Sequence, residues 1–424
     1  MLKTFRPLLV SVILILAGIS AFGQTYLDLI RENPAVASWA FYTYPDPGNV
    51  TLTKAPKGFH PIYISHYGRH GSRYHASESF FIQGKEGLQK IKDAGLLTPT
   101  GESLYREFFK VVNEHDGMIG MLSPLGAREH RAIAQRMYDR FGEVFKKRSE
   151  VDIVSSPIQR CIISMSNFTF TLKDNAPNLQ YTYSTGDRYM AYICKEIDNP
   201  EMFAATGEYE RSTREATCRY DKLFSSIFTS PEKAEALLED PQLFVRSVFL
   251  TGCICDCLDF LDTDIFKYFD PEELAQQATI RNNKFYGEYG GSKEWGDVSD
   301  EVAHDLLKDF IAKADAALAP GSGRAADLRF GHDSGLLPLM GLLKIDGMDV
   351  RYPMATAQDS WSCHEHMPMA SNFQMIFYRN RKGETLVKML FNEKETAIKA
   401  VPAYSGPYYR WEDLRDYFVR ISSD

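Results

Sequence analysis

The sequence has no excess of positive charge, no repeated segment and no low-complexity tract. Its formal net charge is −8 over 424 residues. Proteins that bind nucleic acid generally present a basic field, so this balance argues against nucleic acid as a partner. An anionic small molecule remains possible, because a few clustered arginines can make a positive pocket in an acidic protein. The lack of a repeat at a fixed period argues against a solenoid.

Long apolar runs are also missing, except for residues 7–19 near the N-terminus. Lys3 and Arg6 precede this run, and an Ala-x-Gly site follows it. This pattern predicts a secretory signal peptide over residues 1–23, and therefore an exported protein that is periplasmic or secreted. The alternative is a membrane anchor, but the run is short for a bilayer and Gly18 interrupts it. We expect no membrane span in the rest of the chain.

Cysteine is scarce, with seven residues in the chain. Export permits disulfides, but an odd number leaves at least one thiol unpaired. Cys253, Cys255 and Cys257 are spaced by single residues, whereas structural zinc sites usually space their ligands more widely and add a second pair. We therefore expect buried thiols or a disulfide there rather than a metal site. His364 and His366 also lack the partners of a tetrahedral set, so no metal or cofactor is predicted.

Predicted strands and helices alternate along the first part of the chain. Residues 59–65 and 151–155 have the apolar patterns of strands. Helices are expected to begin near Thr-Pro or Ser-Pro pairs at 98–99, 123–124 and 156–157, because a hydroxyl caps a helix and proline suits its first turn. The alternation predicts an α/β fold with an open, mostly parallel sheet flanked by helices.

Residues 176–324 are rich in charged helical stretches and poor in strand signals. We interpret them as an inserted α-helical domain that forms one side of a substrate cleft. The sheet pattern resumes at residues 327–331, and a hairpin is expected over residues 373–391. The predicted α/β core therefore consists of residues 24–175 and 325–424.

Two arginines flank a histidine in residues 69–73, directly after the first predicted strand. The guanidiniums of Arg69 and Arg73 can each donate paired charge-assisted hydrogen bonds to a tetrahedral oxyanion. The glycines at 68 and 71 allow the backbone to turn sharply beside a ligand. His70 is then placed to attack whatever the arginines bind. The alternative is a solvated turn with surface arginines.

Two further segments follow predicted strands in the same way. Arg160 lies in the first turn of the helix that follows Ser156-Pro157, where backbone amides already favour an anion. His332 and Asp333 come directly after the strand at 327–331. The carboxyl ends of strands are where ligands bind in open α/β sheets. An imidazole there can donate to a phosphate oxygen, and an adjacent carboxylic acid can protonate a departing alkoxide.

Together these segments resemble the histidine phosphatase superfamily, in the branch that contains histidine acid phosphatases and phytases. The resemblance covers most of the chain in order, with RHGxR, then SSPIQR at 155–160, a helical insert and the HD segment. Residues 61–75 and 122–141 look most like bacterial relatives of multiple inositol polyphosphate phosphatase. That group typically carries His-Ala-Glu in the third segment, whereas this chain has His332-Asp333, the pattern of acid phosphatases and many other phytases.

The resemblance implies a phosphomonoesterase that needs no metal or cofactor and acts through a phosphohistidine. His70 is the implied nucleophile, and Asp333 is the implied proton donor, followed by activation of water for hydrolysis. The phosphate is expected to bind to four side chains: Arg69, Arg73, Arg160 and His332. An acid-to-neutral pH optimum is expected, because the donor must hold its proton.

The substrate is left open by the sequence. Inositol polyphosphates such as phytate are the leading expectation, and the alternative is a broad-specificity acid phosphatase acting on sugar or other organic monophosphates. A catalytically inactive phosphoanion-binding protein is disfavoured, because a binder needs neither a nucleophile nor an acid. Cations of the insert could contact the substrate: Arg188, Lys195, Arg211 and Arg214. The sequence gives no expectation for the oligomeric state.

Other candidates have a simpler interpretation. His66 and His75 flank the motif and could line the pocket, but histidines with a structural role are expected there. Arg128 and His130 are expected on the polar side of a helix. Trp411 is expected to be a packing anchor.

Overall fold

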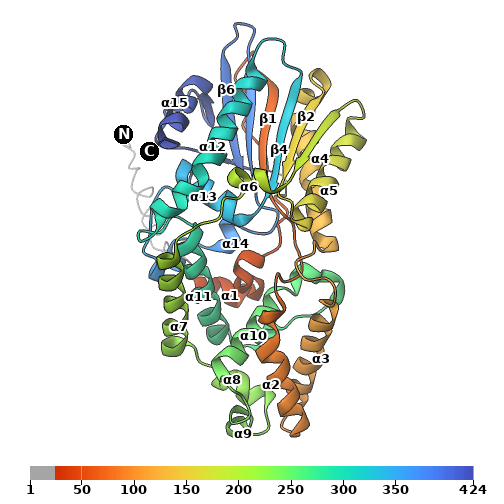
Figure 1. Ribbon diagram of the computed structural model, residues 1–424, viewed down its shortest axis with the longest axis vertical. Helices are drawn as coiled ribbons and strands as arrows, with labels where there is room; N and C mark the ends of the chain where they lie inside the picture. The colour runs from red at the N-terminus through yellow and green to blue at the C-terminus, as the bar shows by residue number, and fades with distance from the viewer. Residues whose placement is uncertain (1–23, 49, 424) are drawn as a thin grey trace, which may run out of the picture.

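The computed structural model describes residues 24–48 and 50–423, so the predicted signal peptide lies outside the described residues. An eight-stranded sheet has the strand order β3-β2-β4-β1-β5-β6-β7, with β8 beside β6 (Figure 1). The strands are β1 (His60–Arg69), β2 (Glu150–Ser155), β3 (Gln180–Thr185), β4 (Arg324–Gly331), β5 (Asn372–Arg379), β6 (Thr385–Phe391), β7 (Lys394–Thr396) and β8 (Tyr408–Arg410). The α/β class and the hairpin of β5 and β6 are as predicted.

The half of the sheet made by β3, β2, β4 and β1 is parallel, whereas β5 to β8 pair in antiparallel fashion. Arg69 at the end of β1 pairs with Gly331 at the end of β4, and Ser155 at the end of β2 pairs with Phe330. The segments that follow β1, β2 and β4, which carry the predicted site residues, therefore leave the sheet at the same side, where these parallel strands have their carboxyl ends. This side is called the edge of the sheet below.

Helices cover both faces of the sheet (Figure 1). On one face α4 (Pro124–Lys147) and α5 (Gln159–Asn175) pack on β1 and β4. On the other face lie α12 (Gly296–Leu318), α13 (Asp333–Leu343) and α15 (Trp411–Ile421). Two of the three predicted caps are present, since the hydroxyls of Thr98 and Ser123 accept from the backbone N–H of Gly101 and Gly126. The third was wrong: α5 begins at Gln159, two residues after Pro157, and no side chain caps it.

Most other helices gather beyond the carboxyl ends of the parallel strands, in the lower half of Figure 1. They are α1 (Tyr26–Glu32), α2 (Ile82–Asp93), α3 (Pro99–Glu114), α7 (Pro200–Thr217), α8 (Asp221–Ile227), α9 (Pro231–Glu235), α10 (Pro241–Cys253) and α11 (Pro271–Tyr289). Two short helices, α6 (Asp187–Ile193) and α14 (Cys363–His366), lie nearer to the sheet. The helical region thus combines segments from before and after β2.

The range 176–324 is not purely helical. Its first element, β3, pairs with β2 along six residue pairs, and α12 packs on the sheet against α13. The sequence pattern missed β3 because this edge strand reads QYTYST and is largely exposed, so it lacks the apolar residues of a buried strand. The division into domains at 175/176 and 324/325 stays a prediction.

Three further features can be compared with the expectations from the sequence. Within the described residues, no helix is both long and apolar enough to cross a bilayer. All seven cysteines are buried free thiols, so Cys253, Cys255 and Cys257 follow the buried-thiol interpretation rather than the disulfide. Trp411 is 7% exposed and packs its ring edge against Phe377, as expected of a packing anchor.

Candidate active site

The turn of residues 69–73 is held rigidly at the end of β1. The backbone N–H of His70 donates to the Gly331 carbonyl, and the His70 carbonyl accepts from Ala370, both at 3.0 Å. A Cβ added to Gly71 would lie 2.6 Å from the Cα of Gly126 in the first turn of α4. Position 71 therefore has to lack a side chain, because the helix packs directly on the turn.

Glu129 on α4 holds the turn of residues 69–73 through hydrogen bonds to Ser72. Glu129 was not assigned to the site from the sequence. Its buried carboxylate accepts from the backbone N–H and the hydroxyl of Ser72, each at 2.7 Å, and from the Tyr44 N–H at 3.0 Å. Burial raises the pKa of Glu129, and the hydrogen bonds oppose that rise. A signal was present, because Glu129 stands four residues before Ile133 on the buried stripe of the helix.

His70 is fixed in a defined tautomer. Its Nδ1 lies 3.0 Å from the carbonyl oxygen of Gly71, which can only accept, so Nδ1 carries the proton and Nε2 keeps its lone pair. Burial, with the positive charges of Arg160 and Arg73, holds the pKa of His70 well below 6.5. The imidazole is therefore neutral at neutral pH, with a free nitrogen among cations.

Three guanidiniums surround this imidazole with little negative charge to balance them. Arg69 is 1% exposed and donates to the Met367 carbonyl at 2.7 Å. Arg73 donates to the Tyr74 carbonyl at 2.9 Å, and burial together with Arg160 and Arg69 lowers its pKa to about 9. Within the described residues, the Nε atoms of Arg69, Arg73 and Arg160 are buried without a partner. Such an excess of buried donors and positive charge is favourable only when an anion occupies the site.

His332 connects the second and third segments. Its Nδ1 lies 3.4 Å from Nη2 of Arg160, and its Nε2 lies 3.0 Å from the hydroxyl of Ser156. Because a guanidinium only donates, Nδ1 accepts and Nε2 carries the proton. Burial and the charge of Arg160 lower the pKa of His332 to about 4. The His332 ring lies 5.5 Å from that of His70, centroid to centroid.

Asp333 begins α13 and forms an ion pair across the site. Its Oδ2 accepts from Nη2 of Arg69 at 2.6 Å, and its Oδ1 accepts from the Ser334 N–H at 2.9 Å. Burial alone would raise the pKa of Asp333, but the charges of Arg69 and Arg73 outweigh it and bring the pKa below 3.8. Without a ligand, Asp333 is therefore a carboxylate held by Arg69.

Tyr67 supports this segment from inside β1, and sequence reasoning gave it no role. Its hydroxyl accepts from the backbone N–H of His332 at 3.1 Å and donates to the Ile193 carbonyl at 2.7 Å. A Cβ at Gly331 would come within 2.1 Å of the same hydroxyl oxygen. The glycine before His332 is thus required by the close approach of Tyr67.

A cavity of about 490 Å³ opens beside Arg160 and His332. Of the insert cations considered above, Lys195 lines it. Arg211 instead pairs with Glu208 and Glu215 on the surface of α7, and Arg214 pairs with Glu210. Arg188 packs on Tyr189 and is not among the residues that line this cavity.

The remaining histidine candidates lie in the core. His66 packs between Phe168 and Phe330, and the Nε2 of His75 donates to the Leu250 carbonyl at 2.6 Å. His130 was expected on a polar helix side, and this was wrong: it is 1% exposed and packs against Phe330, because α4 presses this position onto the sheet. Arg128 on the same helix is exposed and pairs with Asp259.

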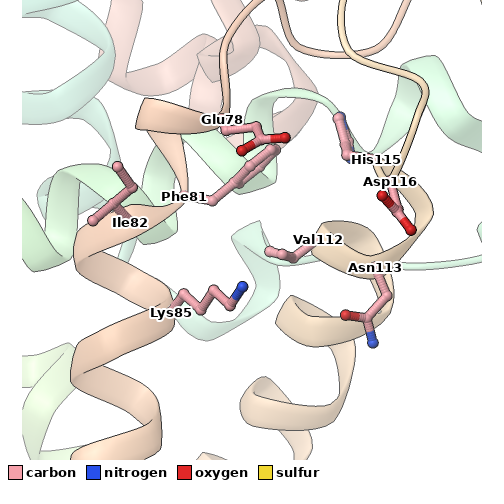
Figure 2. A pocket seen from close by; sticks show the side chains of 8 residues that line it. All are labelled: Glu78, Phe81, Ile82, Lys85, Val112, Asn113, His115 and Asp116. Atoms are coloured by element: carbon pink, nitrogen blue, oxygen red, sulfur yellow. The ribbon is translucent and has the colours of Figure 1, made fainter.

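A second cavity, of about 420 Å³, lies between α2 and α3. Its lining includes none of the residues from the three strand-end segments. Figure 2 shows Phe81 and Val112 at this cavity, with Lys85 extending from α2. The ring of His115 is engaged on both nitrogens, since Nδ1 donates to the Val111 carbonyl at 2.7 Å and Nε2 accepts from the His75 N–H at 3.1 Å.

Comparison with known structures places the fold. The multiple inositol polyphosphate phosphatase of Bifidobacterium longum, solved with phosphate, is 18% identical, with a TM-score of 0.75 over 90% of this chain and 97% of that one. The phytase of D. castellii is 15% identical, with a TM-score of 0.68 over 91% and 85% of the two chains. The phytase of Citrobacter braakii is 11% identical, with a TM-score of 0.54 over 85% and 98%. No curated protein matches by sequence.

A family model covers the turn of residues 69–73, most of the helical region and the HD segment together. The model of the histidine phosphatase superfamily (branch 2) matches residues 68–392, most of the chain. This range contains all three segments that meet at the edge of the sheet. The chain therefore belongs to branch 2 of the histidine phosphatase superfamily.

Proposed function

We propose that the protein is a phosphomonoesterase that acts through a phosphohistidine formed on His70. The observation that carries this proposal is the neutral His70 ring, with Nε2 unprotonated, among the buried guanidiniums of Arg69 and Arg73 and the partly buried one of Arg160. Phosphoryl transfer needs positive charge around the equatorial oxygens and an aligned nucleophile. The guanidiniums of Arg69, Arg73 and Arg160 supply the charge. His332 can donate a hydrogen bond to the phosphate once its Nε2–H leaves the hydroxyl of Ser156.

In the first step Nε2 of His70 forms a bond to phosphorus, and the bond from phosphorus to the ester oxygen breaks. The departing oxygen takes the electron pair of that bond and a proton from Asp333. In the second step Asp333, now a carboxylate, accepts a proton from water as the water attacks phosphorus. The P–N bond breaks, and His70 returns to its neutral form.

Asp333 must gain its proton when the substrate binds, because Arg69 holds it ionised in the free site. A phosphate dianion competes with Asp333 for the ion pair with Arg69 and places negative charge beside the carboxyl. Both changes raise the pKa of Asp333. Substrate binding is therefore coupled to proton uptake, which favours an acid-to-neutral optimum.

Two substrate classes remain candidates. Inositol polyphosphates are supported by the resemblance of the motifs and by the fold shared with a multiple inositol polyphosphate phosphatase and phytases. Singly phosphorylated esters are favoured by the lining of the cavity, where Lys195 is accompanied by Glu196. We also propose that the chain is exported, on the basis of the pattern in residues 1–23.

The experiment that tests the mechanism is a rapid alkaline quench during turnover, followed by mass spectrometry of peptides. Phosphohistidine survives alkali, so a phosphorylated peptide containing His70 is expected from the wild type. The variant His70→Ala should give no adduct and no turnover. An adduct on another residue, or turnover that strictly requires an added divalent metal, would contradict the proposal.

A further inference from the structure

The cavity beside the phosphate-binding groups has almost no net charge beyond them. Lys195 and Glu196 are consecutive residues after α6, and both line this space. Along the described part of its wall, Lys195 is the one cation besides Arg160, and Glu196 offsets its charge. Additional phosphates on a substrate would therefore enter a wall that offers no surplus of positive charge to hold them.

Much of the same wall is apolar. Ile158 and Phe203 are 41% and 39% exposed, although both are large apolar side chains. Met190 and Ile197 lie with them, and Tyr289 adds an aromatic face from the end of α11. Exposed apolar groups gathered around a cavity mark a ligand-binding surface, and covering them with an apolar group is favourable.

We infer that the substrate carries a single phosphate on an apolar alcohol part, which lies against Ile158, Phe203 and Tyr289. Glu196 then acts as a specificity residue that disfavours esters bearing further phosphates. This inference rests on the proposed function, because it takes Arg160 and His332 as the end of the cavity that holds the reacting phosphate. The alcohol part extends from there along the apolar wall.

Three esters built on one six-membered ring separate charge from shape: cyclohexyl phosphate, myo-inositol monophosphate and inositol hexakisphosphate. We expect kcat/KM for cyclohexyl phosphate to exceed that for the hexakisphosphate by about tenfold or more. Six phosphates per molecule and a more acidic leaving alcohol both favour the hexakisphosphate, so neither can produce this preference. A hexakisphosphate value equal to or above that of cyclohexyl phosphate would overturn the inference.

Variants locate the effect. Glu196→Lys should reduce the preference for cyclohexyl phosphate over the hexakisphosphate by about tenfold, mainly through KM of the hexakisphosphate. Glu215→Lys is the matched control, because Glu215 is 60% exposed on α7, pairs with Arg211 and does not line the cavity. It should leave the preference unchanged. An equal change in both variants, or none in Glu196→Lys, would overturn the role of Glu196.

Phe203→Ser tests the apolar wall separately, since a half-exposed side chain can be replaced without loss of the core. It should lower kcat/KM for cyclohexyl phosphate relative to myo-inositol monophosphate by about tenfold. An unchanged ratio would overturn the contact with Phe203. If the wild type hydrolyses none of the three esters, while the purified protein is folded, the proposed function itself fails and the inference fails with it.

Discussion

Two clusters of cations in this molecule look alike in composition and differ in what lies at their centre. At the edge of the sheet, Arg69, Arg73 and Arg160 surround the neutral ring of His70. In the helical region, Arg214, Arg246, Arg281 and Lys284 all contact Glu210. Burial opposes the ionisation of Glu210, but these cations hold its pKa far below the usual range.

The difference teaches that a count of arginines does not identify an anion site. Glu210 is the anion of its own cluster, so the cluster is an ion-pair network that holds α7 against α10 and α11. At the sheet edge Asp333 pairs with Arg69, and the guanidiniums face the neutral ring of His70 instead of a shared carboxylate. We therefore expect substitutions in the first cluster to affect chemistry and those in the second to affect stability.

The largest effect is expected from His70→Ala. Under the proposed mechanism, removal of the His70 imidazole prevents formation of the phosphohistidine and should lower kcat by at least about 10⁴-fold. The variant should stay folded and should still bind inorganic phosphate, measured by calorimetry, since the guanidiniums remain. Loss of phosphate binding together with activity would show that the three guanidiniums do not form an anion site without His70.

Asp333→Asn should lower kcat by about 10²-fold to 10⁴-fold, the range for a general acid. The loss should be greatest for esters of poorly leaving alcohols and least for p-nitrophenyl phosphate, whose leaving group needs little protonation. A series of aryl and alkyl phosphates measures this slope. Equal losses across the series would show that Asp333 is not the proton donor.

Glu210→Gln should behave in the opposite way. It leaves four partly buried cations without their shared carboxylate, so we expect about 3–5 kcal/mol less free energy of unfolding in urea. Activity per folded molecule should change little below the midpoint. Glu208→Gln is a suitable control, because Glu208 is 58% exposed and pairs only along α7. A drop in activity without a loss of stability would contradict a structural role for the Glu210 ion pairs.

The smallest expected effect is a difference in the pH ranges over which the buried histidines and Glu210 change the free energy of unfolding. Burial lowers the pKa of His75 to about 3 and that of His130 to about 4, whereas an unfolded histidine titrates near 6.5. As the pH falls below about 6.5, the unfolded chain takes up protons that these folded histidines refuse, so the free energy of unfolding decreases. The depressed pKa of Glu210 has its effect only below about 4.5, where the unfolded glutamate begins to protonate.

Urea titrations between about pH 7 and pH 4 measure this decrease. His130→Phe should make the decrease in the free energy of unfolding with falling pH shallower, because it removes one histidine whose pKa is lowered by folding. The new ring would lie beside Phe168 and Phe330. A curve identical to that of the wild type would show that His130 does not contribute.

The sequence predicted the position of the site because strand ends and motifs coincide. Residues 69–73, Arg160 and His332-Asp333 each follow a strand, and a parallel sheet brings such ends to one edge. The roles of these residues stay predictions. Glu129 and Tyr67 could not be assigned in the same way, since each acts through a neighbour that only the folded chain supplies. His130 was misplaced for a different reason: it stands three residues before Ile133 on the buried face of α4, whereas Arg128 lies on the exposed face.

The seven buried thiols would have a practical consequence if the chain is exported as proposed. Every cysteine is packed in the finished fold as a free thiol, and burial raises the pKa of those such as Cys161 and Cys257 to about 12. The folded protein is therefore protected from oxidants, whereas a chain that folds slowly outside the cytoplasm exposes thiols that can mispair. Recovery from denaturant should depend on added reductant, and the finished enzyme should not.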